Sequence, residues 1–202
     1  MIHHDMYTQK IGALAEKYAD KTAITFMRSD GRITKTSYSD ILFICKDMKK
    51  ILDSVGVVAG DRVAIVSPHS PQALLTALGL AYSNVQTVLI DASLPGSEIN
   101  RLLKLADVRG LFVTEQIQKI IEQDHINGIP VFKLCDEEGK YILFEDSVKT
   151  VNKEKTPDAE TDVIAILFSS GTTAQMKGIK VTYKSVLLAS EIFIRNIKHL
   201  KL

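Results

Sequence analysis

Short apolar runs alternate with segments of helical periodicity along this chain, and that alternation most constrains its fold. Continuous apolar runs, such as residues 62–66 and 163–168, are typical of strands buried on both faces of a parallel sheet. Parallel strands need crossover connections, and residues with helical spacing separate these runs. The sequence therefore predicts an α/β fold, with a largely parallel sheet flanked by helices.

The same pattern predicts the order of the elements. An initial β-hairpin is expected from residues 22–26 and 32–36, because the turn-prone residues 29–31 separate two strand-like runs. Further strands are expected at 62–66, 85–90, 110–113, 130–132 and 163–168, the last as a central strand. Helices are expected at 37–54, 71–82, 96–106, 116–123 and 183–197. Residues 136–162 are charged and turn-rich, which predicts an exposed connection.

Composition and charge exclude several classes of protein. Apolar residues make up 46% of the 202 residues and charged residues 24%, so the chain should fold. A net charge of +1 gives no electrostatic footprint for nucleic acid or an anionic membrane. The start has no signal-peptide pattern, and no apolar run reaches the length of about 18 residues that a membrane span needs. We expect a cytoplasmic protein without a membrane span.

The cysteines and histidines form no recognisable site. Cys45 and Cys135 fit neither a disulfide framework nor a Cys-x-x-Cys metal cluster, so two buried or idle thiols are expected. The adjacent histidines at positions 3 and 4 should lie in a frayed, unstructured terminus. The remaining histidines have no partner carboxylate at a recognisable spacing, and we expect loop or capping roles for them: His69, His125 and His199.

Residues 169–178 carry the strongest chemical signal. Four hydroxyls, two glycines and a lysine fall within ten residues, directly after an apolar strand: Ser169, Ser170, Gly171, Thr172, Thr173, Lys177 and Gly178. Free backbone N–H groups, hydroxyl donors and a cation are what a phosphate-binding loop needs. Ligands of α/β sheets also tend to bind beyond the carboxyl ends of strands. Composition alone leaves an ordinary polar turn as an equal alternative.

Two known nucleotide-binding loops are excluded. A P-loop requires Gly-Lys followed by Ser or Thr, whereas here Lys177 precedes Gly178 and Ile179 follows. No Gly-x-Gly-x-x-Gly turn follows any predicted strand, so the fingerprint of a dinucleotide-binding enzyme is missing.

Residues 168–178 resemble the signature loop of the adenylate-forming (AMP-binding) superfamily, which includes acyl-CoA synthetases, luciferases and peptide-synthetase adenylation domains. Segments at 36–42, 56–65, 77–79 and 89–95 are also similar to family segments and lie at family-like spacing. The resemblance covers roughly residues 8–190 and implies that 1–202 is the N-terminal part of an AMP-binding domain. Three residues depart from the family pattern: Ala174 replaces glycine, Met176 replaces proline and Tyr183 replaces histidine.

The resemblance implies an ATP-dependent ligase that activates a carboxylate as an acyl-adenylate and transfers it to a thiol, with coenzyme A as the expected acceptor. ATP and Mg²⁺ would be required. The loop residues named above would bind the β- and γ-phosphates, and no catalytic or metal-binding residue is expected in this chain. The family's later elements, including the C-terminal domain, have no counterpart before Leu202. We therefore expect the chain alone to be inactive and to self-associate through apolar surface.

Two alternatives stay open. A peptide-synthetase adenylation domain would load an amino acid onto a carrier protein. A non-catalytic nucleotide-binding or interaction module would be consistent with the three departures, Ala174, Met176 and Tyr183.

Overall fold

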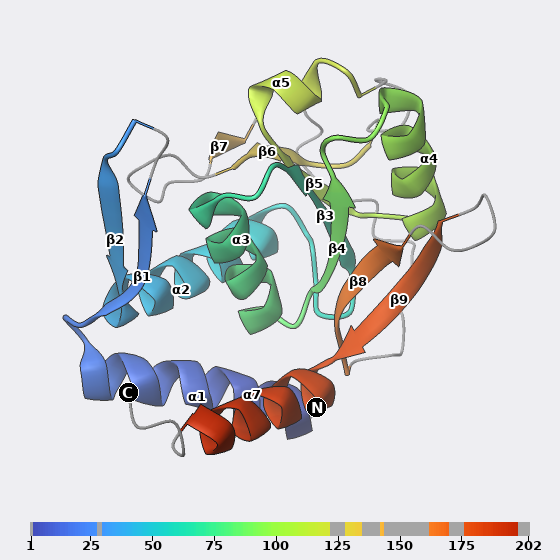
Figure 1. Cartoon of the computed structure of the whole chain (residues 1–202). Helices are drawn as coiled ribbons and strands as arrows, with labels where there is room; N and C mark the ends of the chain where they lie inside the picture. Colours follow the sequence, from blue (N-terminus) through green and yellow to red (C-terminus); the bar gives the residue numbers. More distant parts are fainter. Residues whose placement is uncertain are drawn as a thin grey trace.

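The computed structural model describes residues 2–27, 30–121, 128–134, 142–143, 162–169 and 176–197. Within these residues, seven strands form one sheet in the order β7-β6-β5-β3-β4-β8-β9 (Figure 1). The parallel strands are β3 (Arg62–Ser67), β4 (Gln86–Asp91), β5 (Gly110–Val113), β6 (Val131–Lys133) and β8 (Val163–Ser169). Antiparallel strands, β7 (Ile142–Leu143) and β9 (Lys177–Thr182), lie at the two ends. The predicted α/β fold is confirmed.

Helices cover both faces of the sheet, because alternate strand residues are apolar on each side. On one face, α2 (Tyr38–Ser54) and α3 (Pro71–Tyr82) pack on a cluster that includes Val63, Ile65 and Phe112. On the other face, α4 (Gly96–Ala106) and α5 (Glu115–Gln118) pack on Ala64 and Val88. The strands therefore occupy the interior, and their ends are the parts of the sheet that remain free for function.

The start of α2 is encoded locally. The Ser37 hydroxyl accepts a hydrogen bond from the Asp40 amide, and the Asp40 carboxylate accepts one from the Ser37 amide, which makes a capping box. Close packing of α2 on α3 depends on Gly79, because a Cβ there would lie 2.8 Å from Met48 Cβ. Larger residues at position 79 would therefore push the two helices apart.

The initial hairpin is also confirmed: β1 (Thr22–Met27) pairs with β2 (Ile33–Ser37) as a separate antiparallel sheet. The interior strand β8 lies second from the end of its sheet and not at the centre. A two-residue strand, β7, occurs within the predicted connection 136–162 and pairs with β6. Apart from β7 and Asp162, that connection lies outside the described residues.

The helix predicted at 116–123 is shorter in the structure, where α5 covers Glu115–Gln118. The chain then turns, which buries Ile121 in the core beside α4. The turn brings the Ile120 carbonyl against Gly96, where a Cβ would lie 3.0 Å from the carbonyl oxygen. Long-range packing on α4 therefore ends α5 earlier than its periodicity indicates.

The expectation of a frayed amino terminus is wrong. Residues Ile2–Tyr18 form helix α1, which packs on α2 and lies beside the last helix, α7 (Tyr183–Ile197) (Figure 1). His3 Nδ1 lies 3.0 Å from Asp162 Oδ1, and His4 Nε2 donates a hydrogen bond to the Tyr82 carbonyl. These partners are far along the chain, so local sequence gives no sign that the terminus is ordered.

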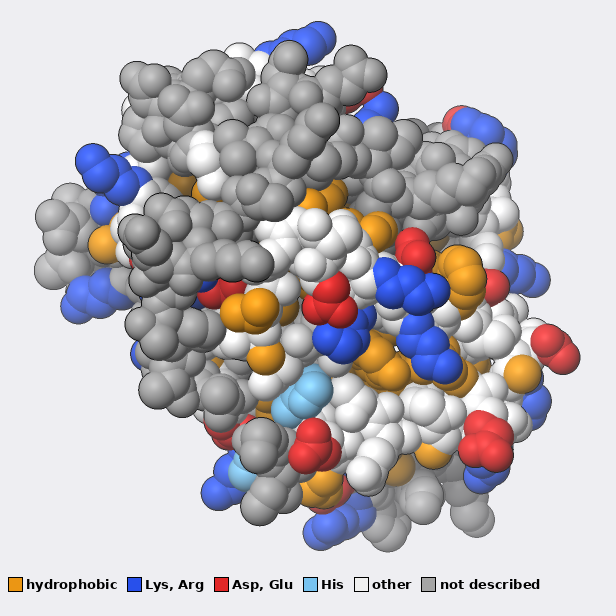
Figure 2. All heavy atoms as spheres, turned by 180° about the vertical axis from the view of Figure 1, so that it is seen from behind, with side chains coloured by type: hydrophobic (Ala, Val, Ile, Leu, Met, Phe, Trp, Pro, Cys, Tyr) orange, Lys and Arg blue, Asp and Glu red, His pale blue; other side chains and the backbone are white. Residues whose placement is uncertain are grey.

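One face of the molecule is mixed in charge. Seen from behind, acidic and basic side chains are interspersed, with hydrophobic side chains in separate areas between them (Figure 2). No helix in the described ranges is both long and apolar enough to cross a membrane.

One buried ion pair connects two strands near their amino ends. Arg109 Nη1 donates to Asp61 Oδ1 at 3.2 Å, and Asp61 Oδ2 accepts from the Val58 amide. Both side chains of the pair are buried, so removal of one would take away an opposite charge that compensates the other. The pair therefore favours the observed arrangement of β3 and the turn before β5.

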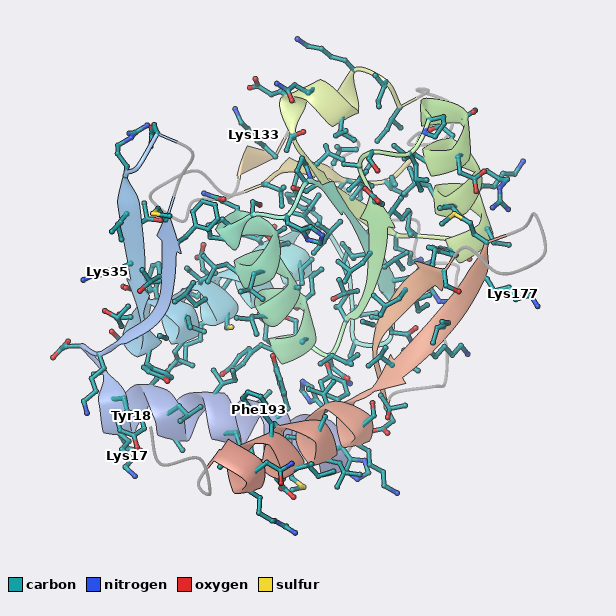
Figure 3. The ribbon with its side chains drawn as sticks, in the orientation of Figure 1. Lys17, Tyr18, Lys35, Lys133, Lys177 and Phe193 are labelled. Carbon is teal, nitrogen blue, oxygen red and sulfur yellow. The ribbon has the colours of Figure 1, made fainter. Side chains whose placement is uncertain are left out.

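Apolar side chains are exposed along α7. Phe193 is 65% exposed, and it is accompanied by Leu188, Ile192 and Ile194, which are each about half exposed. Figure 3 places Phe193 on α7, beside α1 at the lower side of the molecule. Apolar surface of this kind is typical of an interaction site.

We expect Cys45 to resist alkylation in the folded protein. Burial raises the pKa of Cys45 from 9.0 to about 12, so the thiol stays protonated. Because the folded-state pKa lies above the unfolded value, burial of the neutral thiol contributes its full share of the folding stability below the unfolded pKa. This contribution is lost as pH rises toward about 12. The test is iodoacetamide labelling followed by mass spectrometry in a Cys135→Ser variant at about pH 8. Equal labelling rates with and without urea would contradict the prediction.

Self-association through apolar surface stays a prediction, and the exposed side chains of α7 are the surface that we expect to carry it. Replacing Phe193 by glutamate should reduce it, because a charge would then lie within the apolar contact. Leu105→Glu is a matched control, since Leu105 is 59% exposed on α4, away from α7. Sedimentation velocity at increasing protein concentration measures the effect. A monomeric parent chain, or equal loss of association in both variants, would contradict the prediction.

Candidate phosphate-binding site

The carboxyl ends of three neighbouring parallel strands form one edge of the sheet. Ser67 pairs in register with Asp91 at the ends of β3 and β4. Leu89 of β4 pairs with Leu167 of β8, so Ser169, two residues further along, lies level with Asp91. Polar side chains at this edge therefore come from segments far apart in the sequence. This is where ligands of open α/β sheets bind.

Lys177 lies at the same edge because β9 returns antiparallel to β8. The register pairs Ser169 with Lys177, so the last residue of β8 and the first of β9 face each other. Lys177 is exposed, and Figure 3 shows its side chain at the start of β9, pointing away from the sheet. The residues that carry a hydroxyl and an ammonium group are thus paired in register where the chain leaves β8 and re-enters β9.

The other predicted loop residues lie outside the described residues: Ser170, Gly171, Thr172 and Thr173. Ala174, one of the departures from the family pattern, also lies outside them. Their roles in phosphate binding stay predictions from the sequence. The structure brings together the two ends of the segment that contains them.

Gly178 lies beside apolar side chains of β8. A Cβ at Gly178 would make ordinary van der Waals contact, 3.4 Å from Ile166 Cγ2 and 3.5 Å from Phe168 Cε1, so packing alone does not require glycine there. Phe168 and Met176 both pack against the core cluster beneath α4. Met176, where the family has proline, is an apolar contact of this core.

Tyr183 does not lie at the site but in the core. It is completely buried at the start of α7, and its hydroxyl donates to the Ala81 carbonyl at 2.6 Å. Burial, with smaller effects of Tyr7 and Asp162, raises the pKa of Tyr183 well above its ordinary value, so the hydroxyl remains a neutral donor. The third departure from the family pattern is thus a structural residue.

Asp91 is a candidate site residue that the sequence interpretation missed. The backbone N–H of Ser93, and then its side chain, hold the pKa of Asp91 below its ordinary value, and His69 contributes electrostatically. The carboxylate is therefore ionised at neutral pH at the same strand edge as Ser169. The signal available in the sequence was Asp-x-Ser immediately after an apolar strand, a typical Asx-turn pattern.

His69 is the one further histidine of the sequence analysis that the structure describes. His69 is exposed in the loop before α3, where Ser70 and not His69 caps the helix. His125, His199 and Cys135 lie outside the described residues. Among the residues that are described, no group of three or more histidine, cysteine or acidic side chains could hold a metal ion.

Comparison with known proteins places this geometry in a family. Crotonobetaine/carnitine–CoA ligase of Salmonella paratyphi A is 29% identical over 187 residues, which cover 87% of this chain and 36% of the ligase. The corresponding ligase of Salmonella paratyphi B is 30% identical over 188 residues. The chain thus spans about a third of the length of these curated relatives.

Solved structures share the fold. A long-chain-fatty-acid–CoA ligase from Archaeoglobus fulgidus matches with a TM-score of 0.66 at 22% identity, covering 88% of this chain and 36% of that one. The nonribosomal peptide synthetase FmoA3, in its α-methyl-L-serine-AMP bound form, matches with a TM-score of 0.64 at 19% identity, covering 89% and 18%. A family model described as AMP-binding enzyme matches residues 13–200, and the chain therefore belongs to the AMP-binding enzyme family.

Proposed function

We propose that the chain is the N-terminal portion of an ATP-dependent ligase of the acyl-CoA synthetase type. In the first step a carboxylate oxygen of the substrate attacks the α-phosphorus of ATP. The bond to the β-phosphate oxygen breaks, which gives an acyl-adenylate and pyrophosphate. In the second step a thiol sulfur, which we assign to coenzyme A, attacks the acyl carbon and AMP leaves. The similarity to carnitine and fatty-acid CoA ligases supports this proposal.

One observation carries the proposal: Lys177 and Ser169 face each other at the carboxyl end of β8. These residues enclose the segment rich in hydroxyls and glycine that resembles the family's phosphate loop. An ammonium group and hydroxyl donors held on paired strands can bind phosphate oxygens without reorganisation, which favours departure of pyrophosphate. Lys177 would stabilise charge on the β- and γ-phosphates and is not a nucleophile or base.

The residues at this edge fit the triphosphate of ATP better than they fit a metal. Lys177 is an exposed cation, whereas the described residues form no cluster suited to Mg²⁺. A magnesium ion would supply further neutralisation of phosphate charge. Its ligands would come from the triphosphate, from water and from parts of a longer protein.

We further propose that this chain binds nucleotide but does not itself form acyl-adenylate. In the family that it resembles, the ribose-binding aspartate and the catalytic lysine belong to later elements. The chain covers only 36% of the curated ligase, which is consistent with catalytic residues that belong to other parts of such an enzyme. We place the protein in the cytoplasm, since a content of two cysteines suits a reducing compartment.

A second candidate is an adenylation domain of a peptide synthetase, favoured by the likeness to FmoA3. Both candidates share the first reaction step and differ in the acceptor thiol. A carrier domain encoded downstream in the same gene would favour the peptide synthetase. A non-catalytic module is the third candidate. The sequence departures Ala174, Met176 and Tyr183 suggest it, although Met176 and Tyr183 have packing roles in the core.

Replacement of Lys177 by alanine should weaken MgATP binding to this chain. Loss of one charged phosphate contact is expected to lower affinity by about tenfold, the effect of a charge-assisted hydrogen bond. Isothermal titration calorimetry measures the change. Lys180→Ala is a matched control on the same strand, because successive strand residues alternate and Lys180 lies on the opposite face from Lys177. Equal weakening by both variants would contradict the prediction, because the loss of any positive charge on β9 would then explain the lower affinity.

Replacement of Thr173 by alanine should slow adenylation in a full-length protein that carries this chain. Loss of one preorganised donor to the transferring phosphates typically lowers kcat by about a hundredfold. The measurement is the rate of carboxylate-dependent exchange of labelled pyrophosphate into ATP. Near-normal exchange in the variant would argue against a phosphate-binding role for the loop.

A further inference from the structure

The outer part of β9 is not fixed by burial. Residues 177–180 are exposed, and burial begins only with Val181 and Thr182. Strand register is strongly specified where one face is buried and weakly where it is not. The pairing of β8 with β9 also contains a register shift between Val163 and Ala165. The position of Lys177 therefore needs an anchor at the buried end of the strand.

Tyr183 supplies that anchor, because it follows the last residue of β9 directly. Its amide donates to the Asp162 carbonyl at 2.9 Å, which closes the open end of the hairpin beside β8. Its hydroxyl donates to the Ala81 carbonyl at the end of α3, a residue 102 positions earlier. The end of β9 is thus tied by hydrogen bonds to β8 and to α3.

The amino-terminal helix holds Tyr183 from another side. The Tyr183 ring makes edge-on contacts with His4 and Tyr7 of α1, with centroids 5.3 and 5.5 Å apart. His4 itself donates to the Tyr82 carbonyl, next to the Ala81 acceptor of Tyr183. The side chain of Tyr183 therefore contacts α1 and α3, and its amide binds Asp162, the residue before β8. These contacts together oppose a shift of Tyr183 along the strand direction.

We infer that Tyr183 is a positioning residue that sets the register of β9 and so holds Lys177 opposite Ser169. This inference rests on the proposed phosphate-binding role of Lys177. Lys177 lies six positions before Tyr183, about 20 Å of extended strand at about 3.3 Å per residue. A slip of one residue would turn Lys177 to the other face of the sheet and remove it from the phosphate edge.

The test compares Tyr183→Phe with Tyr7→Phe in the complete chain. Each variant removes one phenolic hydroxyl from the same aromatic cluster, but only the Tyr183 hydroxyl ties the hairpin to α3. Two quantities are measured: hydrogen–deuterium exchange of the β9 amides, and the affinity for inorganic tripolyphosphate. Thermal unfolding of each variant is recorded separately, so that loss of general stability can be recognised.

We expect β9 amides to exchange about fivefold faster in Tyr183→Phe, the factor for loss of one buried hydrogen bond. Tripolyphosphate affinity should also fall, by at most the same factor, because affinity scales with the fraction of chains in which Lys177 holds its register. Tyr7→Phe should change neither quantity at equal thermal stability. Indistinguishable β9 exchange in the two variants would overturn the inference. If Tyr183→Phe does not fold, Tyr183→His replaces it. The smaller histidine ring lacks the phenolic hydroxyl that binds Ala81, so it should also accelerate β9 exchange. Exchange at the rate of the parent chain would overturn the inference.

The two readouts separate this inference from the proposed function. If the parent chain does not bind tripolyphosphate but β9 exchange responds to Tyr183→Phe, the anchor is supported and phosphate binding by this chain fails. If the parent binds and the affinity is unchanged while β9 exchange rises, Tyr183 anchors the strand without positioning Lys177, which overturns the inference.

Discussion

Burial of both faces of the parallel sheet is the constraint on which the rest of the structure depends. Alternate residues of β3 and β4 enter two different clusters, one beneath α4 and one beneath α2 and α3. Because no face of these strands is left for solvent, chemistry is confined to their ends. The site at the carboxyl edge is thus a direct consequence of where apolar surface has to go.

The edge combines groups of opposite charge from different segments. Lys177, paired in register with Ser169, offers a cation, and Asp91 offers an ionised carboxylate at the end of β4. If this edge binds phosphate as proposed, the carboxylate on a neighbouring strand suits a ligand that carries both negative phosphates and donor groups. ATP meets that description, since its ribose hydroxyls and adenine amino group are donors.

Two of the three departures from the family pattern lie in the packed core. Tyr183 is a fully buried donor in the core, and Met176 packs against the same cluster as Phe168. Both substitutions are thereby explained by packing and do not by themselves argue against nucleotide binding. The amino-terminal helix shares in this arrangement through His4 and Tyr7, although its sequence alone indicated an unstructured end.

The sequence by itself determined what depends on near neighbours: the alternation of elements, the capping box at Ser37, the limits of α3 and α4, and the loop that resembles a phosphate site. Tertiary structure alone decided the early end of α5, the order in α1, the pairing of Lys177 with Ser169 and the anchor at Tyr183. The physical reason is sequence separation. Periodicity and caps act within a few residues, whereas the Tyr183–Ala81 hydrogen bond joins residues 102 positions apart and exists only after the sheet has formed.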